Sequence, residues 1–107
     1  MRNHFAESMA NQFGNYLCQK IIEVSSPPEL ASIIEVICPF AVQISYSVHG
    51  TRAMQSLIEM TAKYIPSLES LCLALIDSLQ TEMLQLCKDS NGNHVIQAFL
   101  TSFKCGD

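Results

Sequence analysis

The sequence lacks the long apolar runs that mark membrane and secreted proteins. Nowhere in its 107 residues does an uninterrupted apolar run approach the 18 or so residues that a membrane span needs. The N-terminal residues Met1 to His4 are not followed by the apolar region of a signal peptide, so no secretory route is indicated. A hydrophobic content of 49% is nevertheless enough to bury a core, and the length allows one compact unit at most.

Motifs that carry catalysis or bind metals are also missing. There is no glycine-rich phosphate loop, and no serine or cysteine lies in a nucleophile motif. His49, His94, Cys72 and Cys87 could be combined into a metal site, but no C-x-x-C or H-x-x-x-H pair supplies the usual spacing. The five cysteines are odd in number and widely spaced, which is typical of reduced intracellular core residues. We therefore expect neither an enzyme nor a cofactor.

Positive charge is scarce. Six Lys and Arg residues stand against ten Asp and Glu residues, giving a net charge of −4. Because phosphate binders usually carry a basic stripe, this balance argues against strong nucleic-acid binding. The objection is partial, since stacking contributes about 1–3 kcal/mol per base when bases are splayed from a single strand.

What the sequence does contain is one pattern that occurs three times. Its copies cover residues 11–22, 47–58 and 89–100. Each is a turn ending in glycine, then a small polar residue, an aromatic residue or arginine, two apolar residues, glutamine, a variable residue and two more apolar residues. Such repetition is typical of stacked units, none of which buries its apolar face alone. Gly14, Gly50 and Gly92 are expected to permit positive φ in the turns.

Wound as a helix, each copy separates into an apolar and a polar face. The apolar faces are expected in the core and consist of Leu17, Cys18, Ile21, Ile22, Ala53, Met54, Leu57, Ile58, Val95, Ile96, Phe99 and Leu100. Each polar face presents a small hydrogen-bonding group and a glutamine one turn apart, with a flat side chain beside them. This arrangement can meet the Watson–Crick edge of one base and stack on its face.

Three pentapeptides, each preceded by glycine, resemble the base-reading motifs of the Pumilio (PUF) family: Asn-Tyr-x-x-Gln, Thr-Arg-x-x-Gln and Asn-His-x-x-Gln. The resemblance covers nearly the whole chain. It implies an all-α, right-handed curved α-solenoid of about three repeats, the first incomplete, that binds single-stranded RNA on its concave face with one base per repeat. The residues implied at the base edge are Asn15, Gln19, Thr51, Gln55, Asn93 and Gln97. Those implied to stack on bases are Tyr16, Arg52 and His94.

The resemblance also implies the bases. In this family Asn with Gln is associated with uracil, and a small residue with Gln is associated with adenine. The Asn15, Thr51 and Asn93 repeats would then read 5′-UAU-3′, which is the same in either direction along the antiparallel RNA. Thr51 departs from the commoner Cys or Ser, and its extra methyl group could loosen or shift the preference for adenine.

The segments between the copies predict further helices. Ser26 and Glu29 have capping-box spacing around two prolines, and the apolar spacing from residue 30 to 37 predicts a core-facing helix. Pro39 is expected to end this helix before a short turn at residues 40–45. The Ile65-Pro66-Ser67 segment predicts a break, and strong periodicity over residues 68–79 predicts another helix.

We therefore expect a partial Pumilio-homology domain over residues 1–107, with repeats at about 1–24, 25–60 and 61–104. Residues 1–9 are expected to form only a short helical piece. Nothing is recognisable as a capping repeat, so both ends should leave apolar surface open. Because the family typically has eight repeats, we expect the chain to be a fragment, a shortened gene product or part of an oligomer.

The expected function is sequence-specific binding of mRNA 3′ untranslated regions in the cytoplasm, with control of translation or decay implied by the resemblance alone. Lys20, Arg52 and Lys104 are predicted on or near the RNA face, with Glu23 and Glu59 in equivalent places. Three repeats alone should bind with micromolar affinity or weaker. Regulatory proteins are possible partners on the convex face, whereas DNA and membranes are not expected. The alternative is a helical-repeat scaffold for a basic protein, which has no reason to place these polar pairs three times over.

Overall fold

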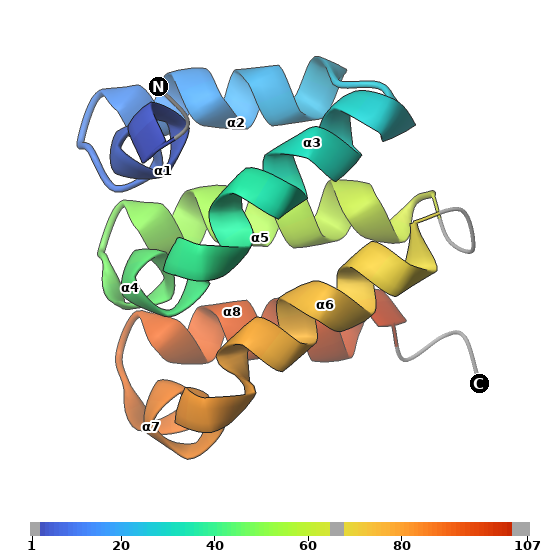
Figure 1. Ribbon diagram of the computed structural model, residues 1–107. Helices are drawn as coiled ribbons and strands as arrows, with labels where there is room; N and C mark the ends of the chain where they lie inside the picture. The colour runs from blue at the N-terminus through green and yellow to red at the C-terminus, as the bar shows by residue number, and fades with distance from the viewer. Residues whose placement is uncertain (1–2, 65–67, 104–107) are drawn as a thin grey trace.

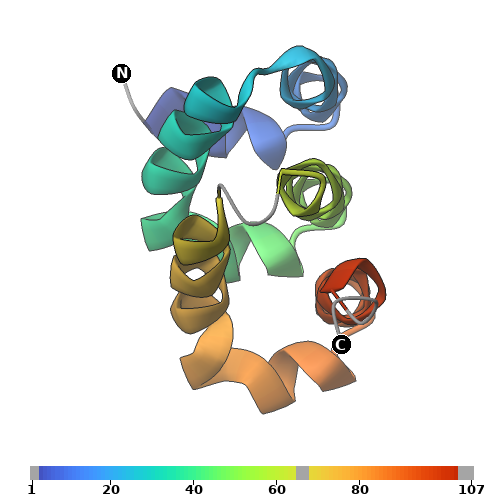
Figure 2. The same cartoon turned by 90° about the vertical axis from the view of Figure 1, so that its right-hand side faces the viewer.

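A computed structural model describes residues 3–64 and 68–103 of the protein, whose helices stack in layers (Figure 1). The first layer consists of α2 (Gly14–Val24), α5 (Gly50–Ala62) and α8 (Gly92–Phe103). These three helices run in the same direction, and Figure 2 shows them end-on in one column. They carry the three copies of the repeated pattern, so equivalent residues of neighbouring copies lie side by side.

The second layer crosses the first obliquely and consists of α3 (Pro27–Ile37) and α6 (Glu69–Leu79) (Figure 1). A 3-10 turn and a short helix lead from each back to the first layer (Figure 2). These are η1 (Cys38–Phe40) with α4 (Ala41–Tyr46), and η2 (Gln80–Glu82) with α7 (Met83–Lys88). Before α2 the described residues hold only the short α1 (Asn3–Met9). The prediction of an all-α solenoid of about three repeats, the first incomplete, is confirmed.

The local signals account for most of the helix boundaries. The Ser26 backbone N–H donates to Glu29 Oε1 at 2.8 Å, which confirms the capping box that begins α3. α3 ends just before the segment containing Pro39, as predicted. The expected turn at residues 40–45 is instead mostly α4, and α7 was not predicted, because helices of six residues are too short to show a period. The predicted break at residues 65–67 lies outside the described residues.

The core fills the space between the layers with aliphatic side chains. Its fully or almost fully buried members include Ile22, Leu30, Ile34, Ile37, Met54, Leu57, Ile58, Leu75, Leu79, Leu86 and Val95. They come from every repeat and from both layers, so the core runs the whole height of the stack. Because each helix contributes only one stripe, the core forms only when the repeats are stacked.

One helical stretch, Pro27–Tyr46, is long and apolar enough to cross a membrane by length and composition alone, even though Glu29 and Glu35 interrupt it. In the structure this stretch is α3, η1 and α4, and the chain turns sharply between α3 and α4 (Figure 2). Five of its apolar side chains, Leu30, Ile34, Ile37, Ala41 and Ile44, are buried in the core. Core packing therefore accounts for much of its apolar character.

Three residues predicted in the core lie on the surface instead. Leu17 is 64% exposed, Ile21 is 38% exposed and Leu100 is 65% exposed. Leu17 and Ile21 belong to α2 and Leu100 to α8, which are the outer helices of the first layer (Figure 1). Each of these helices has a neighbour on one side only among the described residues, so part of its apolar face stays uncovered.

Burial also protects two thiols. Burial raises the pKa of the Cys18 thiol from 9.0 to about 11, and burial together with Glu69 raises the pKa of the Cys72 thiol from 9.0 to about 11. At a given pH below 9, each shift lowers the thiolate population about 100-fold. We expect a thiol reagent to modify the two buried thiols much more slowly than the exposed Cys87, which timed mass spectrometry of peptides would show.

The same shifts make the folded state less stable in alkali. The unfolded chain ionises these thiols near pH 9.0 and the folded chain near pH 11, so the free energy of unfolding falls as the pH rises through this interval. Urea titrations should show a smaller fall for the Cys18→Ala and Cys72→Ala double variant than for the unchanged chain. An equal fall in the two proteins would contradict the assignment.

Candidate nucleic-acid interface

A side chain three residues before each glycine holds the turn that begins each first-layer helix. Asn11 Oδ1 accepts hydrogen bonds from the backbone N–H groups of Phe13 and Gly14, both at 2.8 Å. Asp89 Oδ2 does the same for Asn91 and Gly92, again at 2.8 Å. In the middle copy, Ser47 Oγ accepts from the Gly50 N–H at 3.1 Å. All three helices therefore begin at the same place in the repeat.

The glycines are required by close packing and not by a positive φ. None of Gly14, Gly50 and Gly92 has φ in the left-handed region, so the predicted reason for them is wrong. Each is the first residue of its helix, and the preceding short helix passes directly against it. An ideal Cβ on Gly50 would lie 2.5 Å from the Ile44 carbonyl oxygen, and one on Gly14 would lie 2.8 Å from that of Ser8. The close contact fixes where the next residue, the first polar position, lies.

In the first and third copies the two amides of the polar pair are bonded to each other. Gln19 Nε2 donates to Asn15 Oδ1 at 3.0 Å, and Gln97 Nε2 donates to Asn93 Oδ1 at 3.0 Å. The Nδ2 groups of both asparagines donate back to carbonyl oxygens of the preceding turn, at 2.7–3.1 Å. The preceding turn therefore fixes each asparagine, and the asparagine fixes the glutamine. Each glutamine keeps one N–H and its carbonyl oxygen for other partners.

The middle copy is built differently. Thr51 Oγ1 donates to the backbone carbonyl of Asn91 at 2.8 Å, across to the next repeat, and the Asn91 side chain donates to the Tyr46 carbonyl at 3.0 Å. Thr51 is only 4% exposed and Asn15 only 1%, so these two predicted base-edge residues do not share the exposed face of their helices. Both lie in the first turn of their helices. The Asn15 side chain bonds the loop before α2, and the Thr51 side chain bonds the loop before α8. Gln55 remains partly exposed.

The three flat side chains lie at the surface of the first layer, one from each helix. Tyr16 is 64% exposed, and Arg52 and His94 are also exposed. Between α5 and α8 there is a surface hollow of about 340 Å³. It is lined by Val48, Thr51, Arg52, Gln55, Asn91 and His94. The structure therefore places the three predicted residues of the second copy around one open space with the flat residue of the third copy. They are Thr51, Arg52, Gln55 and His94.

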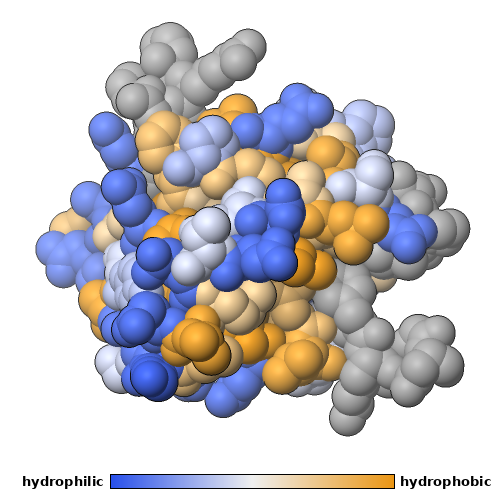
Figure 3. All heavy atoms as spheres, turned by 60° about the horizontal axis from the view of Figure 1, so that its bottom comes forward, coloured by the Kyte–Doolittle hydropathy of each residue, from blue (hydrophilic) through white to orange (hydrophobic). Residues whose placement is uncertain are grey.

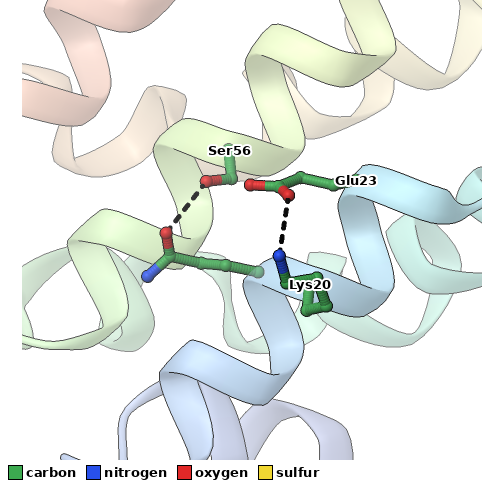
Figure 4. A network of polar contacts seen from close by, with 4 residues as sticks. Lys20, Glu23 and Ser56 are labelled. Atoms are coloured by element: carbon green, nitrogen blue, oxygen red, sulfur yellow. Dashed lines mark hydrogen bonds and ion pairs between the residues drawn. The ribbon is translucent and has the colours of Figure 1, made fainter.

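A further polar contact joins the first two copies (Figure 4). Ser56 Oγ of α5 donates to Gln19 Oε1 at 3.4 Å, a long hydrogen bond that turns the Gln19 amide toward α5. Nearby, Lys20 Nζ lies 3.8 Å from Glu23 Oε1, and both side chains are more than half exposed (Figure 4). Such an exposed pair adds little stability, but it partly neutralises a cation of this surface.

Sequence reasoning missed the residues that position the site. These are Asn11, Ser47, Asp89, Asn91 and Ser56. The first three share a signal that was available, because Asn, Ser and Asp favour such turns and stand at the same distance from each glycine. Asn91 and Ser56 act between repeats, which no local pattern shows. The predicted cation Lys104 lies outside the described residues. Within residues 3–64 and 68–103, no three His, Cys, Asp or Glu side chains group to hold a metal ion.

The fold and the site together define a helical-repeat solenoid that sets one polar pair and one flat side chain on each first-layer helix. The family model described as the Pumilio-family RNA binding repeat matches residues 4–38 and 82–104, which is more than half of the chain. The chain therefore belongs to the Pumilio family. The unmatched stretch includes α5 with Thr51, where the polar pair departs most from the other two copies.

Similar proteins extend the match through the middle repeat. Pumilio domain-containing protein C6G9.14 of Schizosaccharomyces pombe is 39% identical over 97% of this chain, and Pumilio homolog 12 of Arabidopsis thaliana is 37% identical over 92%. The solved structure of the Puf4 RNA binding domain bound to HO endonuclease RNA 3′ UTR recognition sequence superposes with a TM-score of 0.85, at 38% identity over 95% of this chain. The chain spans 14% and 16% of the two relatives and 30% of the Puf4 chain.

Proposed function

We propose that this chain binds single-stranded RNA along the surface of α2, α5 and α8, with one base at each helix. The observation that supports this most is the recurrence of a glutamine beside an exposed flat side chain on each helix of the layer, with the glutamine amide held by an asparagine on α2 and on α8. The Puf4 domain that this chain resembles is bound to RNA in its solved structure.

The hydrogen bonds support a proposal for how the bases would be read. A primary amide offers a donor and an acceptor side by side, which complements the N3–H and a neighbouring carbonyl of uracil as well as the N1 and N6–H of adenine. The glutamine alone therefore accepts either base, and the first polar residue makes the choice. Asn15 and Asn93 can add a donor for the second uracil carbonyl if their Nδ2 groups leave the turn carbonyls. The Thr51 hydroxyl group already donates its hydrogen bond to the Asn91 backbone carbonyl.

We therefore propose the preference 5′-UAU-3′, with the middle position the most permissive because Gln55 there acts without a second donor. The cellular targets would be mRNA 3′ untranslated regions, and the outcome control of translation or decay in the cytoplasm. Support for the target class comes from Puf4 and from a Puf4 mutant, each of which is bound to a 3′ UTR recognition sequence in its solved structure.

Fluorescence anisotropy with a short labelled RNA containing UAU, compared with a cytosine-substituted RNA, tests this function. The UAU strand should bind at least about 10-fold more tightly, since a matched base edge contributes about 1–3 kcal/mol. Changing Gln19, Gln55 and Gln97 together to alanine should lower the affinity about 10-fold or more. Because few cations lie on this surface, the salt dependence should be shallow.

A matched control is available, because exposed glutamines also lie on helices outside the first layer. Changing Gln43, Gln80 and Gln85 together to alanine removes the same chemical groups from α4, η2 and α7. This control should bind like the unchanged chain. Equal binding of both RNAs, or equal loss of affinity in both triple variants, would contradict base reading by the first layer.

A further inference from the structure

The turn before α8 is bonded to the middle repeat at two points. Thr51 Oγ1, in the first turn of α5, donates to the backbone carbonyl of Asn91 at 2.8 Å. Asn91 Nδ2 donates to the backbone carbonyl of Tyr46, the last residue of α4, at 3.0 Å. Asn91 directly precedes Gly92, the first residue of α8. The two bonds therefore tie the place where α8 begins to the end of α4 and the start of α5.

The Asn91 carbonyl oxygen also accepts a bond from the flat residue of the third copy. The backbone N–H of His94 donates to it at 3.2 Å, so this one oxygen accepts from both Thr51 and His94. Its two lone pairs allow both bonds at once. The His94 side chain and that of Arg52, the neighbour of Thr51 in α5, line the same surface hollow of about 340 Å³. The Thr51 hydroxyl group therefore links the two helices that carry these side chains.

Thr51 differs in this bond from the equivalent residues of the other two copies. Asn15 and Asn93 occupy the same position of α2 and α8, and their Nδ2 groups donate to carbonyl oxygens of the turn in their own repeat. Thr51 bonds forward to the next repeat instead. Its hydroxyl group has a single hydrogen, which this bond uses, and the residue is only 4% exposed. It therefore has no second donor to offer to a base.

Hydrogen bonds fix the approach of two helices more narrowly than apolar packing does. Polar and apolar side chains are interspersed on the lower side of the molecule, where α7 and α8 lie (Figures 1 and 3). Apolar contact is non-directional and tolerates small shifts, whereas a hydrogen bond specifies both a distance and a direction. Loss of the Thr51 bond should therefore let the start of α8 shift while the helices stay packed.

We propose that the Thr51 hydroxyl is a positioning group of the RNA interface and reads no base: it holds the start of α8 against α5, and so sets where His94 lies relative to Arg52. The inference rests on the proposed function, because it assigns Thr51 a part in the same interface. Stacking is largely independent of which base is stacked. Without the hydroxyl group, RNAs that differ only in the middle base should therefore lose affinity by the same factor, whereas loss of a base-reading group would change the preference.

The Thr51→Val variant tests the proposal, because valine keeps the shape of the side chain but has no hydroxyl group. In NMR titrations its affinity should fall about 2–10-fold for an RNA containing UAU, the size expected for one hydrogen bond, and by the same factor for one containing UCU. Thr51→Ser keeps the hydroxyl group and should restore the affinity of the unchanged chain. A fall confined to the UAU strand would show that Thr51 reads the middle base, and would overturn the proposal.

Thr61→Val is the matched control. Thr61 is also a buried threonine of α5, but its hydroxyl donates to the Leu57 carbonyl of the same helix, at 2.6 Å. This control should bind both RNAs like the unchanged chain. In a chain that already carries His94→Ala, Thr51→Val should lower the affinity less than about 2-fold, because the side chain that it positions is gone. An equal loss in the control, or an undiminished loss beside His94→Ala, would contradict the positioning role.

Hydrogen exchange in the RNA-free chain separates a failure of this inference from a failure of the proposed function. The amide protons of Gly92 and His94 should exchange about 2–10-fold faster in Thr51→Val than in the unchanged chain or in Thr61→Val, since the turn has lost one bond. Unchanged exchange would overturn the positioning role whatever the RNA affinities are. Faster exchange in a chain that binds no RNA would confirm the link between the repeats, overturn its role in an RNA interface, and identify the proposed function as the part that failed.

Discussion

Replacing Ile58 by alanine is expected to lower the free energy of unfolding by about 3–4 kcal/mol, within the range of about 2–5 found for large-to-small core changes. Ile58 is 1% exposed and belongs to α5, which packs against α2 on one side, α8 on the other, and α3 and α6 behind. Because α5 is packed against these helices, the cavity left in its buried face can collapse only partly. For a domain with a total stability of about 5–15 kcal/mol, this is a large share.

The control for this prediction is the same repeat position at the end of the stack. Leu100→Ala removes an aliphatic side chain that is 65% exposed, so it should cost less than about 0.5 kcal/mol. Urea unfolding followed by far-UV circular dichroism measures both values. Similar costs at the two positions would contradict the packing argument.

Replacing Gly50 by alanine is expected to cost about 2–3 kcal/mol, at the upper end of what overpacking usually costs. The added Cβ would lie 2.5 Å from the Ile44 carbonyl oxygen and 2.8 Å from Ile44 Cγ2. The nearest of these atoms is backbone, so α4 and α5 would have to move apart. Since Gly50 is only the first residue of α5, the better helix propensity of alanine offsets little of this cost.

Gly92→Ala is the matched control for the close approach. There the nearest atom to an added Cβ is Leu86 Cδ2 at 2.7 Å, the end of a flexible side chain, and the Leu86 carbonyl oxygen lies farther away, at 3.1 Å. A change of rotamer relieves most of the contact, so we expect a cost of about 1 kcal/mol or less. Thermal melts should therefore give a clearly lower melting temperature for Gly50→Ala than for Gly92→Ala. The reverse order would contradict the packing argument.

The sequence predicted best what is periodic or chemically explicit. The helix over residues 69–79 follows from its apolar spacing, and the start of α3 follows from Ser26, Glu29 and the two prolines between them. The three first-layer helices followed from three copies of one pattern. These features depend on neighbours a few residues away, which is the range over which a sequence pattern carries structural information.

The positions that sequence reasoning missed depend on other repeats. Leu17 and Leu100 are as apolar as their buried counterparts, and they are exposed because no helix of the described residues covers them. Thr51 matches the polar pattern, but its hydroxyl group bonds a carbonyl 40 residues away. Helical spacing gives the direction of a side chain on its own helix, and it contains no information on what the next helix places there.

The unequal packing of the three first-layer helices has a consequence for motion. In stacked repeats stability is a sum of terms within each repeat and between nearest neighbours, so opening begins at the ends. α5 has a layer neighbour on both sides, whereas the described residues give α2 and α8 one each. Amide protons of α5 should exchange with solvent slowest. The middle amide, Gln55, then stands on the most persistent helix, and a bound strand would be released from its two outer bases inward.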